Sequence, residues 1–427
     1  MVTGGSTAPI LTRDEVHQVV AEGFAPLPID GRRVLALIPD RTRTMPMPMM
    51  FDVFEQVIGR RAAALDYLVA LGTHQPLGDD QLAAHLGRTV AGGVAGRSRI
   101  FNHRWDDPAT FVTAGVIPAH EVSGLTDGLM VDPVPVTLNR LLFEYDHVVI
   151  CGPVFPHEVV GFSGGNKYLV PGVAGPGVID LTHWIGALMT SSRVIGAGYT
   201  PVRAVIDRAA AMVDRPVTCT ALVVTHQGLS GVFVGPAREA WEQAAALSAR
   251  LHIVRVARPF SRVLSIMPAM YDDLWTAAKG MYKLEPVVAD GGEVIIYAPD
   301  LTEVSYTHGA LIDEIGYHCR DYFLGNWARF GRYPGGVLAH STHLKGLGTF
   351  DRATGREEAR ISVTLATRIP ADRCARINLG YLDPATIRID EWTGREAEGI
   401  LVVPRAGEML YRLAGDQVGV LPGEETR

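Results

Sequence analysis

Residues 147–183 read HVVICGPVFPHEVVGFSGGNKYLVPGVAGPGVIDLTH, and this stretch carries the most distinctive pattern in the chain. It starts with an apolar run, His147–Cys151, which is typical of a buried strand. A glycine-rich loop follows, and Pro176, a favoured first-turn residue, then opens a helix. A strand, a loop and a helix in this order predict one repeating element of an α/β domain with a largely parallel sheet.

Short apolar runs alternate with amphipathic stretches on both sides of this segment. In the first half of the chain we predict strands at Val34–Ile38, Leu65–Ala70, Ser98–Asn102, His147–Cys151 and Val217–Val224. A second series begins near Arg262, with strands predicted at Arg262–Ile266, Glu293–Ala298 and Val337–His340 and helices at Tyr271–Met281 and Ala310–Asn326. The chain has 427 residues, too many for one compact core, so its length predicts two or three domains. The candidate crossing between the two series is Val256–Phe260.

Composition narrows the function classes. Hydrophobic residues make up 47% of the chain and charged residues 20%, which excludes a disordered or fibrous protein. The net charge of −7 offers no basic footprint for nucleic acid, and no apolar run is long enough to predict a membrane span. The four cysteines (151, 219, 319 and 374) form no close pair, and no signal peptide is visible, so we expect a reduced compartment and a cytoplasmic protein.

Reactive residues follow four of the predicted strands in the first half. Along the chain these strand ends run into Asp40-Arg41-Thr42-Arg43, Gly72-Thr73-His74, Asn102-His103 and Gly152-Pro153-Val154-Phe155-Pro156-His157. Ligands of open α/β sheets bind beyond the carboxyl ends of the strands, so we expect these side chains to converge on one cleft.

The loop Gly161–Lys167 matches a phosphate-binding loop only in part. Asn166 and Tyr168 stand where that pattern requires Gly and then Ser or Thr. Its Ser-Gly-Gly turn can still form an anion nest from backbone N–H groups, or it is an ordinary glycine turn. Lys167 becomes a candidate nucleophile if it is desolvated here, although an isolated lysine is more often a solvated surface residue.

His183 lies on the helix that Pro176 opens. The apolar stripe of this helix is Leu181, Trp184, Ile185 and Leu188. His183 is about 200° round the helix from Leu181, and its neighbours Gly186 and Ala187 leave space for a bulky group. This second face makes His183 a candidate metal ligand.

The remaining candidates suit acid/base chemistry on a carboxylate substrate. His74 and His157 titrate near neutrality and can each act as general acid or base. Arg43 can clamp a carboxylate with Asp40 orienting it, and Lys279 can reach the same carboxylate, unless it is a solvated helix lysine. A zinc hydrolase is disfavoured because His340 and His343 have no carboxylate at metal-site spacing and read as polar loop residues. A nicotinamide dehydrogenase is disfavoured because DRTRT follows the first strand where GxGxxG would be needed.

Taken together, these segments resemble the nickel-dependent lactate racemase family. The resemblance is carried by Asp40-Arg41-Thr42-Arg43, by Gly72-Thr73-His74 and above all by PHEVVGFSGGNKYLVPGV followed by His183, with Lys279 extending it into the second half. It implies two α/β domains with the active site in the interdomain cleft. The first domain would comprise residues 1–256 plus 385–427, with the C-terminal tail returning to it, and the second would comprise residues 257–384.

The resemblance also implies a cofactor. Family members hold a nickel pincer nucleotide, a pyridinium mononucleotide whose two sulfur arms grip nickel together with a ring carbon. Lys167 matches the lysine joined covalently to it, and His183 matches the nickel ligand. Cofactor contacts are further expected from Thr73, Ser163, Gly164 and Gly165, with the local glycines letting the main chain approach the nucleotide closely. Cofactor-making enzymes are then expected partners.

For the reaction, the resemblance implies racemisation or epimerisation of a 2-hydroxy acid by hydride abstraction from C2 and return to the opposite face. His74 and His157 match the acid/base pair, and Arg43 and Lys279 match the groups that hold the carboxylate. The chain departs from the family at Trp275-Thr276, where a Tyr-Gln pair is usual, so these two residues are expected to shape a pocket for an aromatic, dicarboxylic or sugar acid as readily as for lactate. A non-catalytic anion- or nucleotide-binding protein and a metal-dependent hydrolase are the alternatives.

Overall fold

The computed structural model describes residue 2 and residues 4–416, and these residues divide into two compact units. Unit 1 holds the chain up to Phe155 together with Ser163–Ile179 and Arg203–Leu251. Unit 2 holds Pro156–Phe162, Asp180–Val202 and the residues from His252 on. The chain therefore passes between the units several times rather than once.

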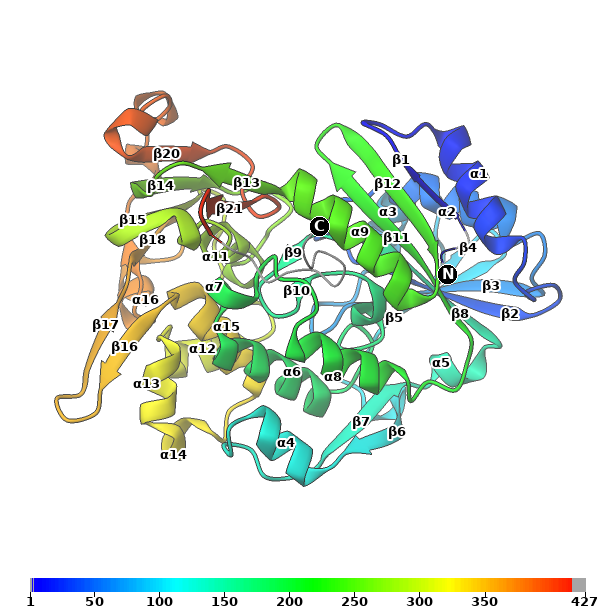
Figure 1. Cartoon of the computed structure of the whole chain (residues 1–427), viewed down its shortest axis with the longest axis horizontal. Helices are drawn as coiled ribbons and strands as arrows, with labels where there is room; N and C mark the ends of the chain where they lie inside the picture. The colour runs from blue at the N-terminus through cyan, green and yellow to red at the C-terminus, as the bar shows by residue number, and fades with distance from the viewer. Residues whose placement is uncertain (1, 3, 417–427) are drawn as a thin grey trace. The chain divides into compact units, whose positions relative to one another are not determined.

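Unit 1 is built on an eight-stranded sheet, in which the strands run in the order β1-β12-β11-β8-β2-β3-β5-β4 (Figure 1). Their bounds are β1 Gly4–Thr7, β12 Gly228–Gly235, β11 Val217–Thr225, β8 His147–Pro153, β2 Arg33–Ile38, β3 Ala64–Val69, β5 Ser98–Asn102 and β4 Val94–Ala95. The five central strands from β11 to β5 are parallel. At the two edges the pairing is antiparallel: β12 pairs with β11, β1 pairs with β12, and β4 pairs with β5.

The central strands form where the sequence has short, continuous apolar runs. Val34–Ile38 is buried along its whole length, because a parallel strand in an α/β sheet is covered on both faces. Alternate residues such as Val34, Ala36 and Ile38 pack in one cluster with α1 (Arg13–Phe24) and α2 (Met47–Val57). All five strands predicted for the first half are confirmed.

Other elements of unit 1 were not predicted from the apolar runs. A separate hairpin joins β6 (Phe111–Ile117) to β7 (Val134–Asn139). The helices wholly or mostly in this unit also include α3 (Asp79–Leu86), α4 (Ala119–Leu125), α5 (Leu141–Glu144), α8 (Pro201–Ala210) and α9 (Ala237–His252).

Unit 2 contains a five-stranded, wholly parallel sheet in the order β19-β18-β15-β14-β20 (Figure 1). Its strands are β19 Gly380–Tyr381, β18 Ser362–Thr367, β15 Val288–Ala298, β14 Phe260–Ile266 and β20 Ile400–Val403. Three short ribbons accompany it: β9–β10 (Pro156–His157 and Gly161–Phe162), β13–β21 (Ile253–Val256 and Leu410–Leu413) and β16–β17 (Gly348–Asp351 and Arg356–Ala359). The α/β class with a largely parallel sheet is thus confirmed.

The helices of unit 2 are short and often interrupted. They are α6 (Pro176–Met189, which begins in unit 1), α7 (Ser191–Val194), α10 (Leu274–Ala277), α11 (Lys279–Tyr282), α12 (Gly309–Ile315), α13 (Arg320–Gly325), α14 (Trp327–Phe330), α15 (Gly335–Lys345) and α16 (Ala371–Arg376). The helix predicted over Ala310–Asn326 breaks into α12 and α13 because Gly316 adopts φ +72°. The one predicted over Tyr271–Met281 starts only at Asp273, which caps α10.

One predicted strand is wrong. Val337–His340 belongs to α15, which is buried on all sides from Val337 to Leu344. A short apolar run inside a fully buried helix has the same composition as a buried strand, so periodicity cannot separate the two.

The predicted domain boundaries also differ from the structure. β20 pairs with β14 and β21 pairs with β13, so residues 385–416 extend unit 2 instead of returning to the first domain. The crossing expected at Val256–Phe260 lies inside unit 2, because the division falls between Leu251 and His252. Residues 417–427, also assigned by that prediction, lie outside the described residues.

Candidate active site

The structure divides the candidate residues between the two units. Unit 1 carries Asp40, Arg43, Thr73, His74, Ser163, Gly164, Gly165 and Lys167. Unit 2 carries His157, His183, Trp275, Thr276 and Lys279. Each group is described in its own unit, and the predicted cleft between the domains stays a prediction.

Asp40 and His74 form a pair beyond the carboxyl ends of β2 and β3. These strands are adjacent and parallel, with Ile38 opposite Val69, so their C-terminal loops emerge at the same edge of the sheet. The Nδ1 atom of His74 contacts a carboxylate oxygen of Asp40. A carboxylate on Nδ1 favours the tautomer that carries its proton there and leaves Nε2 for proton exchange. Asp40 therefore orients His74 directly, a role not anticipated from the sequence.

Asp40 is held as a carboxylate. Burial alone raises the pKa of Asp40, but the charge and hydrogen bond of His74, the charge of Arg43 and a hydrogen bond from Thr42 outweigh it and hold the pKa well below its usual range. Thr42 donates both its backbone N–H, at 3.0 Å, and its hydroxyl, at 2.7 Å, to Asp40 Oδ1. The negative charge next to His74 is thus a fixed property of this loop.

The loop that carries His74 is tied to the segment that carries Lys167. The backbone N–H of Gly72 donates to the carbonyl of Gly172 at 2.9 Å. Tyr168, next to Lys167, lies close enough to Arg43 and Asp40 for both charges to affect its pKa. In unit 1 the structure thus groups Asp40, Arg43 and His74 near the lysine loop, as the strand-end argument predicts.

The serine and glycines of the lysine loop pack against unit 1 itself. Ser163 is buried, accepts a hydrogen bond from the Phe155 N–H at 2.9 Å and donates to the Pro153 carbonyl at 3.2 Å. Gly164 adopts φ +82° and Gly165 φ +58°. A Cβ on Gly164 would lie 2.6 Å from Val154 Cγ2, and one on Gly165 2.9 Å from Trp241 Cβ. Backbone geometry and internal packing therefore already require these glycines, which the prediction attributed to close approach by a nucleotide.

Helix α8 anchors the same loop through two residues that the sequence analysis missed. Arg203, almost wholly buried, donates from Nη1 to the Gly164 carbonyl at 3.1 Å and lies over the Trp241 ring at 4.2 Å. Asp207, one turn later, accepts from Asn166 Nδ2 at 2.9 Å. The spacing of four residues between an arginine and an aspartate on α8 was the available signal. The half-buried Lys167 is thus presented by a firmly held backbone.

His157 lies on the β9–β10 hairpin of unit 2 and is 8% exposed. Its Nδ1 atom accepts a hydrogen bond from the Val159 N–H at 3.2 Å and also lies 3.2 Å from Glu158 Oε2. His157 therefore has a carboxylate neighbour, as His74 does.

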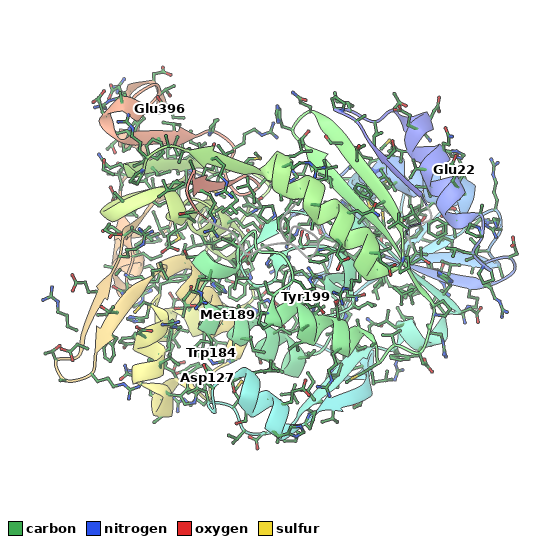
Figure 2. All side chains as sticks on the ribbon, in the orientation of Figure 1. Glu22, Asp127, Trp184, Met189, Tyr199 and Glu396 are labelled. Atoms are coloured by element: carbon green, nitrogen blue, oxygen red, sulfur yellow. The ribbon has the colours of Figure 1, made fainter. Side chains whose placement is uncertain are left out.

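His183 is half-buried on α6, whose labelled residues Trp184 and Met189 can be followed in Figure 2. Trp184 is fully buried and stacks on Trp327 with the ring centroids 5.2 Å apart, so the apolar stripe packs as predicted. The open space expected at Gly186 is filled, however, because Val159 lies 3.0 Å from where a Cβ on Gly186 would be.

Lys279 and Trp275 lie four residues apart on the successive helices α11 and α10. Ala278 between them has helical dihedral angles, so the two side chains share one face. The Nζ atom of Lys279 lies 4.5 Å from the centroid of the Tyr271 ring. Thr276 is buried, and its hydroxyl donates to Oδ1 of Asp273, the N-cap of α10, at 2.8 Å. The hydroxyl that was expected to face substrate therefore bonds within its own helix.

Three further histidines of unit 2 were missed or misread. His340 stacks on Trp275 with a centroid distance of 3.9 Å, and His308 lies tilted against it at 4.6 Å. His340 and His343 are buried in α15 and are not loop residues. Burial lowers the pKa of His343 to about 4, and burial, followed by the electrostatic influence of the His343, His308 and His183 imidazoles, lowers the pKa of His340. These four histidines therefore interact within unit 2.

One strand-end histidine does not belong with the others. His103 is fully buried, with Nε2 3.2 Å from the Ala174 carbonyl and Nδ1 3.1 Å from Asn139 Nδ2. Burial lowers the pKa of His103 to about 4, so it is a neutral core residue.

Two properties of the described residues bear on the kind of site. Within residue 2 and residues 4–416, no group of three or more His, Cys, Asp and Glu side chains is arranged to hold a metal ion. None of the helices in that part of the chain is both long and apolar enough to cross a membrane. All four cysteines are free and buried.

Fold and site together define an α/β protein with histidine–carboxylate pairs and a buried lysine loop. Comparison with known proteins places it more narrowly. Residues 19–196 match the lactate racemase N-terminal domain, and a curated lactate racemase from Thermoanaerobacterium thermosaccharolyticum is 21% identical over 277 residues, 63% of this chain and 60% of that protein's length. Residues 19–196 of this chain thus belong to the lactate racemase N-terminal domain family.

Solved structures agree with this fold. The crystal structure of a Thermotoga maritima protein is similar with a TM-score of 0.89 and 31% identity, covering 96% of this chain and all of that one. The lactate racemase apoprotein of T. thermosaccharolyticum is similar with a TM-score of 0.68 and 17% identity, covering 90% of this chain and 88% of that one.

Proposed function

We propose that the chain is a racemase or epimerase of a 2-hydroxy acid. The observation that carries the proposal is the Asp40–His74 pair, a prepared proton acceptor in a chain that carries the lactate racemase N-terminal domain. The Asp40 carboxylate fixes the imidazole tautomer and stabilises the cation that forms when Nε2 takes a proton. His74 is thereby suited to remove the proton of a C2 hydroxyl, and His157, with Glu158 beside it, is suited to return one.

The proposed cofactor is the nickel pincer nucleotide that the resemblance implies. Lys167 would tether it, because the loop holding this lysine is fixed by Arg203 and Asp207 and leaves the side chain only half-buried. His183 would bind nickel, for which imidazole nitrogen is a suitable donor. When bound, this group would supply the acceptor for the hydrogen on C2.

The substrate carboxylate would be held by two cations. Arg43 offers a planar fork for bidentate binding, and Lys279 offers a point charge next to the Tyr271 ring. Trp275, on the face that carries Lys279, would then contact the remainder of the substrate. Its size relative to the tyrosine usual in the family is our reason to test substrates other than lactate.

The deciding experiment loads the protein by co-expression with the cofactor-making enzymes. Single enantiomers of aliphatic, aromatic, dicarboxylic and sugar 2-hydroxy acids are then followed by chiral chromatography in D₂O. We expect one class to interconvert with its C2 hydrogen retained, and a mass adduct on the Lys167 peptide. Lys167→Arg keeps the charge but should lose both adduct and activity. An active protein without adduct, or deuterium at C2, would contradict the proposal.

A further inference from the structure

His157 has two neighbours at the same ring nitrogen, and they suit different charge states. Its Nδ1 atom lies 3.2 Å from the Val159 nitrogen, which donates a hydrogen, and 3.2 Å from Glu158 Oε2, which can only accept one when ionised. Neutral imidazole with an unprotonated Nδ1 satisfies Val159. The imidazolium, with a proton on Nδ1, satisfies Glu158 instead.

The hairpin that carries these groups is fixed on both sides. Gly161, with φ +82°, pairs with His157 across the hairpin, and its carbonyl accepts from the Gly196 N–H at 2.9 Å. A Cβ on Gly161 would lie 2.2 Å from the Ala197 carbonyl oxygen, so the backbone there is closely packed. Val159 meanwhile packs on Gly186 of α6. The Val159 N–H is therefore held in place beside the ring.

Other titratable groups surround the hairpin. Glu158 interacts with His343 of α15, which is buried with an unpartnered Nε2 atom. Helix α6, which packs on Val159, carries Asp180 and His183. The wild-type protein and the Glu158→Gln variant both contain His343, Asp180 and His183. A difference in the pKa of His157 between these two proteins therefore reports on the Glu158 carboxylate.

We propose that Glu158 is a positioning residue that sets the proton affinity of His157, by accepting the Nδ1 hydrogen of the imidazolium while Val159 serves the neutral ring. The role of this proton affinity in turnover rests on the proposed function. The pairing itself does not, because it concerns the protein without cofactor or substrate.

The test is a histidine titration of the cofactor-free protein by NMR, with ¹³C-labelled imidazole rings and His157→Gln to assign the signal. Glu158→Gln should lower the pKa of His157 by about one unit, as expected for loss of a carboxylate in contact. Glu396→Gln, at the exposed residue labelled in Figure 2, is the matched control for removing one negative charge from unit 2.

An unchanged pKa of His157 in a folded Glu158→Gln protein would overturn the proposal. If that variant does not fold, Glu158→Asp retains the charge but retracts it from Nδ1 and should give a smaller shift in the same direction; no shift would again overturn it. In loaded protein, the His157-dependent limb of the pH–rate profile should move with the titration. A shifted titration in a protein that racemises nothing would leave this inference standing and remove the proposed function.

Discussion

At the scale of single residues, each histidine assigned to acid/base chemistry lies against a carboxylate. His74 contacts Asp40, and His157 lies beside Glu158. Both histidines were predicted from the sequence, but Asp40 was expected to orient Arg43. The pairing with His74 depends on the register of β2 against β3, which sets two loops from different strands side by side.

The role of Asp40 predicts a large kinetic effect. Asp40→Asn keeps the shape of the side chain but removes the charge that stabilises protonated His74. We expect the racemisation rate of loaded protein to fall on the order of 10²- to 10⁴-fold. The rate is measured with the preferred substrate, and Asp106→Asn, at an exposed aspartate of the same unit, is the control. A loss under threefold would contradict the role.

The lowered pKa of Asp40 predicts a pH-dependent stability. Because the folded pKa lies below the unfolded value of about 3.9, ionised Asp40 stabilises the fold above that pH, and this stability is lost as the pH falls toward the folded pKa. The wild-type protein should therefore melt above Asp40→Asn at pH 6. The gap in melting temperature should narrow at about pH 3, and a gap independent of pH would argue against the ionised carboxylate.

At the scale of elements, the glycine-rich loop is shaped by its own packing. Gly164→Ala places a Cβ against Val154 in a left-handed backbone conformation, so we expect a loss of about 1–3 kcal/mol in the free energy of unfolding. Gly124→Ala, in helix α4 with open space around it, should be neutral or slightly stabilising. Urea unfolding measures the free energy of unfolding of both variants and of the wild-type protein. A Gly164→Ala protein as stable as the wild type would show that packing does not require Gly164.

Helix α15 is capped from outside by Asp180. Its Oδ1 atom accepts from the Gly336 N–H at 2.9 Å, yet burial raises the pKa of Asp180 to about 6. A raised folded pKa means that stability is fully present below about pH 4 and is lost as the pH rises through 6. Asp180→Asn should remove this dependence, on the order of 2–3 kcal/mol between pH 4 and 7. Urea unfolding at the two pH values measures it, and an unchanged dependence in the variant would contradict the assignment.

At the scale of the whole molecule, the C-terminal segment decides where unit 2 ends. β20 forms an edge of its parallel sheet, and Arg412 of β21 donates to the carbonyls of Ser192 and Ile195 at 2.7 and 2.8 Å. Deleting residues 400–427 should therefore accelerate amide hydrogen exchange in β14, whose neighbour is lost, and leave β8 of unit 1 protected. Faster exchange confined to unit 1 would instead favour the predicted return of the tail to the first domain.

Sequence patterns alone predicted the α/β class, the five parallel strands of the unit 1 sheet, the strands β14 and β15 of the unit 2 sheet, and the resemblance that the family match confirmed. These properties are local, because a short apolar run or the PHEVVGFSGGNKYLVPGV motif carries its information within a few consecutive residues. The strand-end rule also located Asp40 and His74 together, since parallel strands bring their carboxyl ends to one edge.

The partners of those residues follow from the tertiary structure and from no local sequence pattern. That Asp40 contacts His74, that Arg203 and Asp207 hold the lysine loop, and that Val159 fills the space at Gly186 all depend on contacts between segments distant in the sequence. The strand misassigned at Val337–His340 has the same cause, because burial on every side erases the periodicity that distinguishes a helix. Side-chain partners are set by distances between segments far apart in the chain, and no local pattern records those distances.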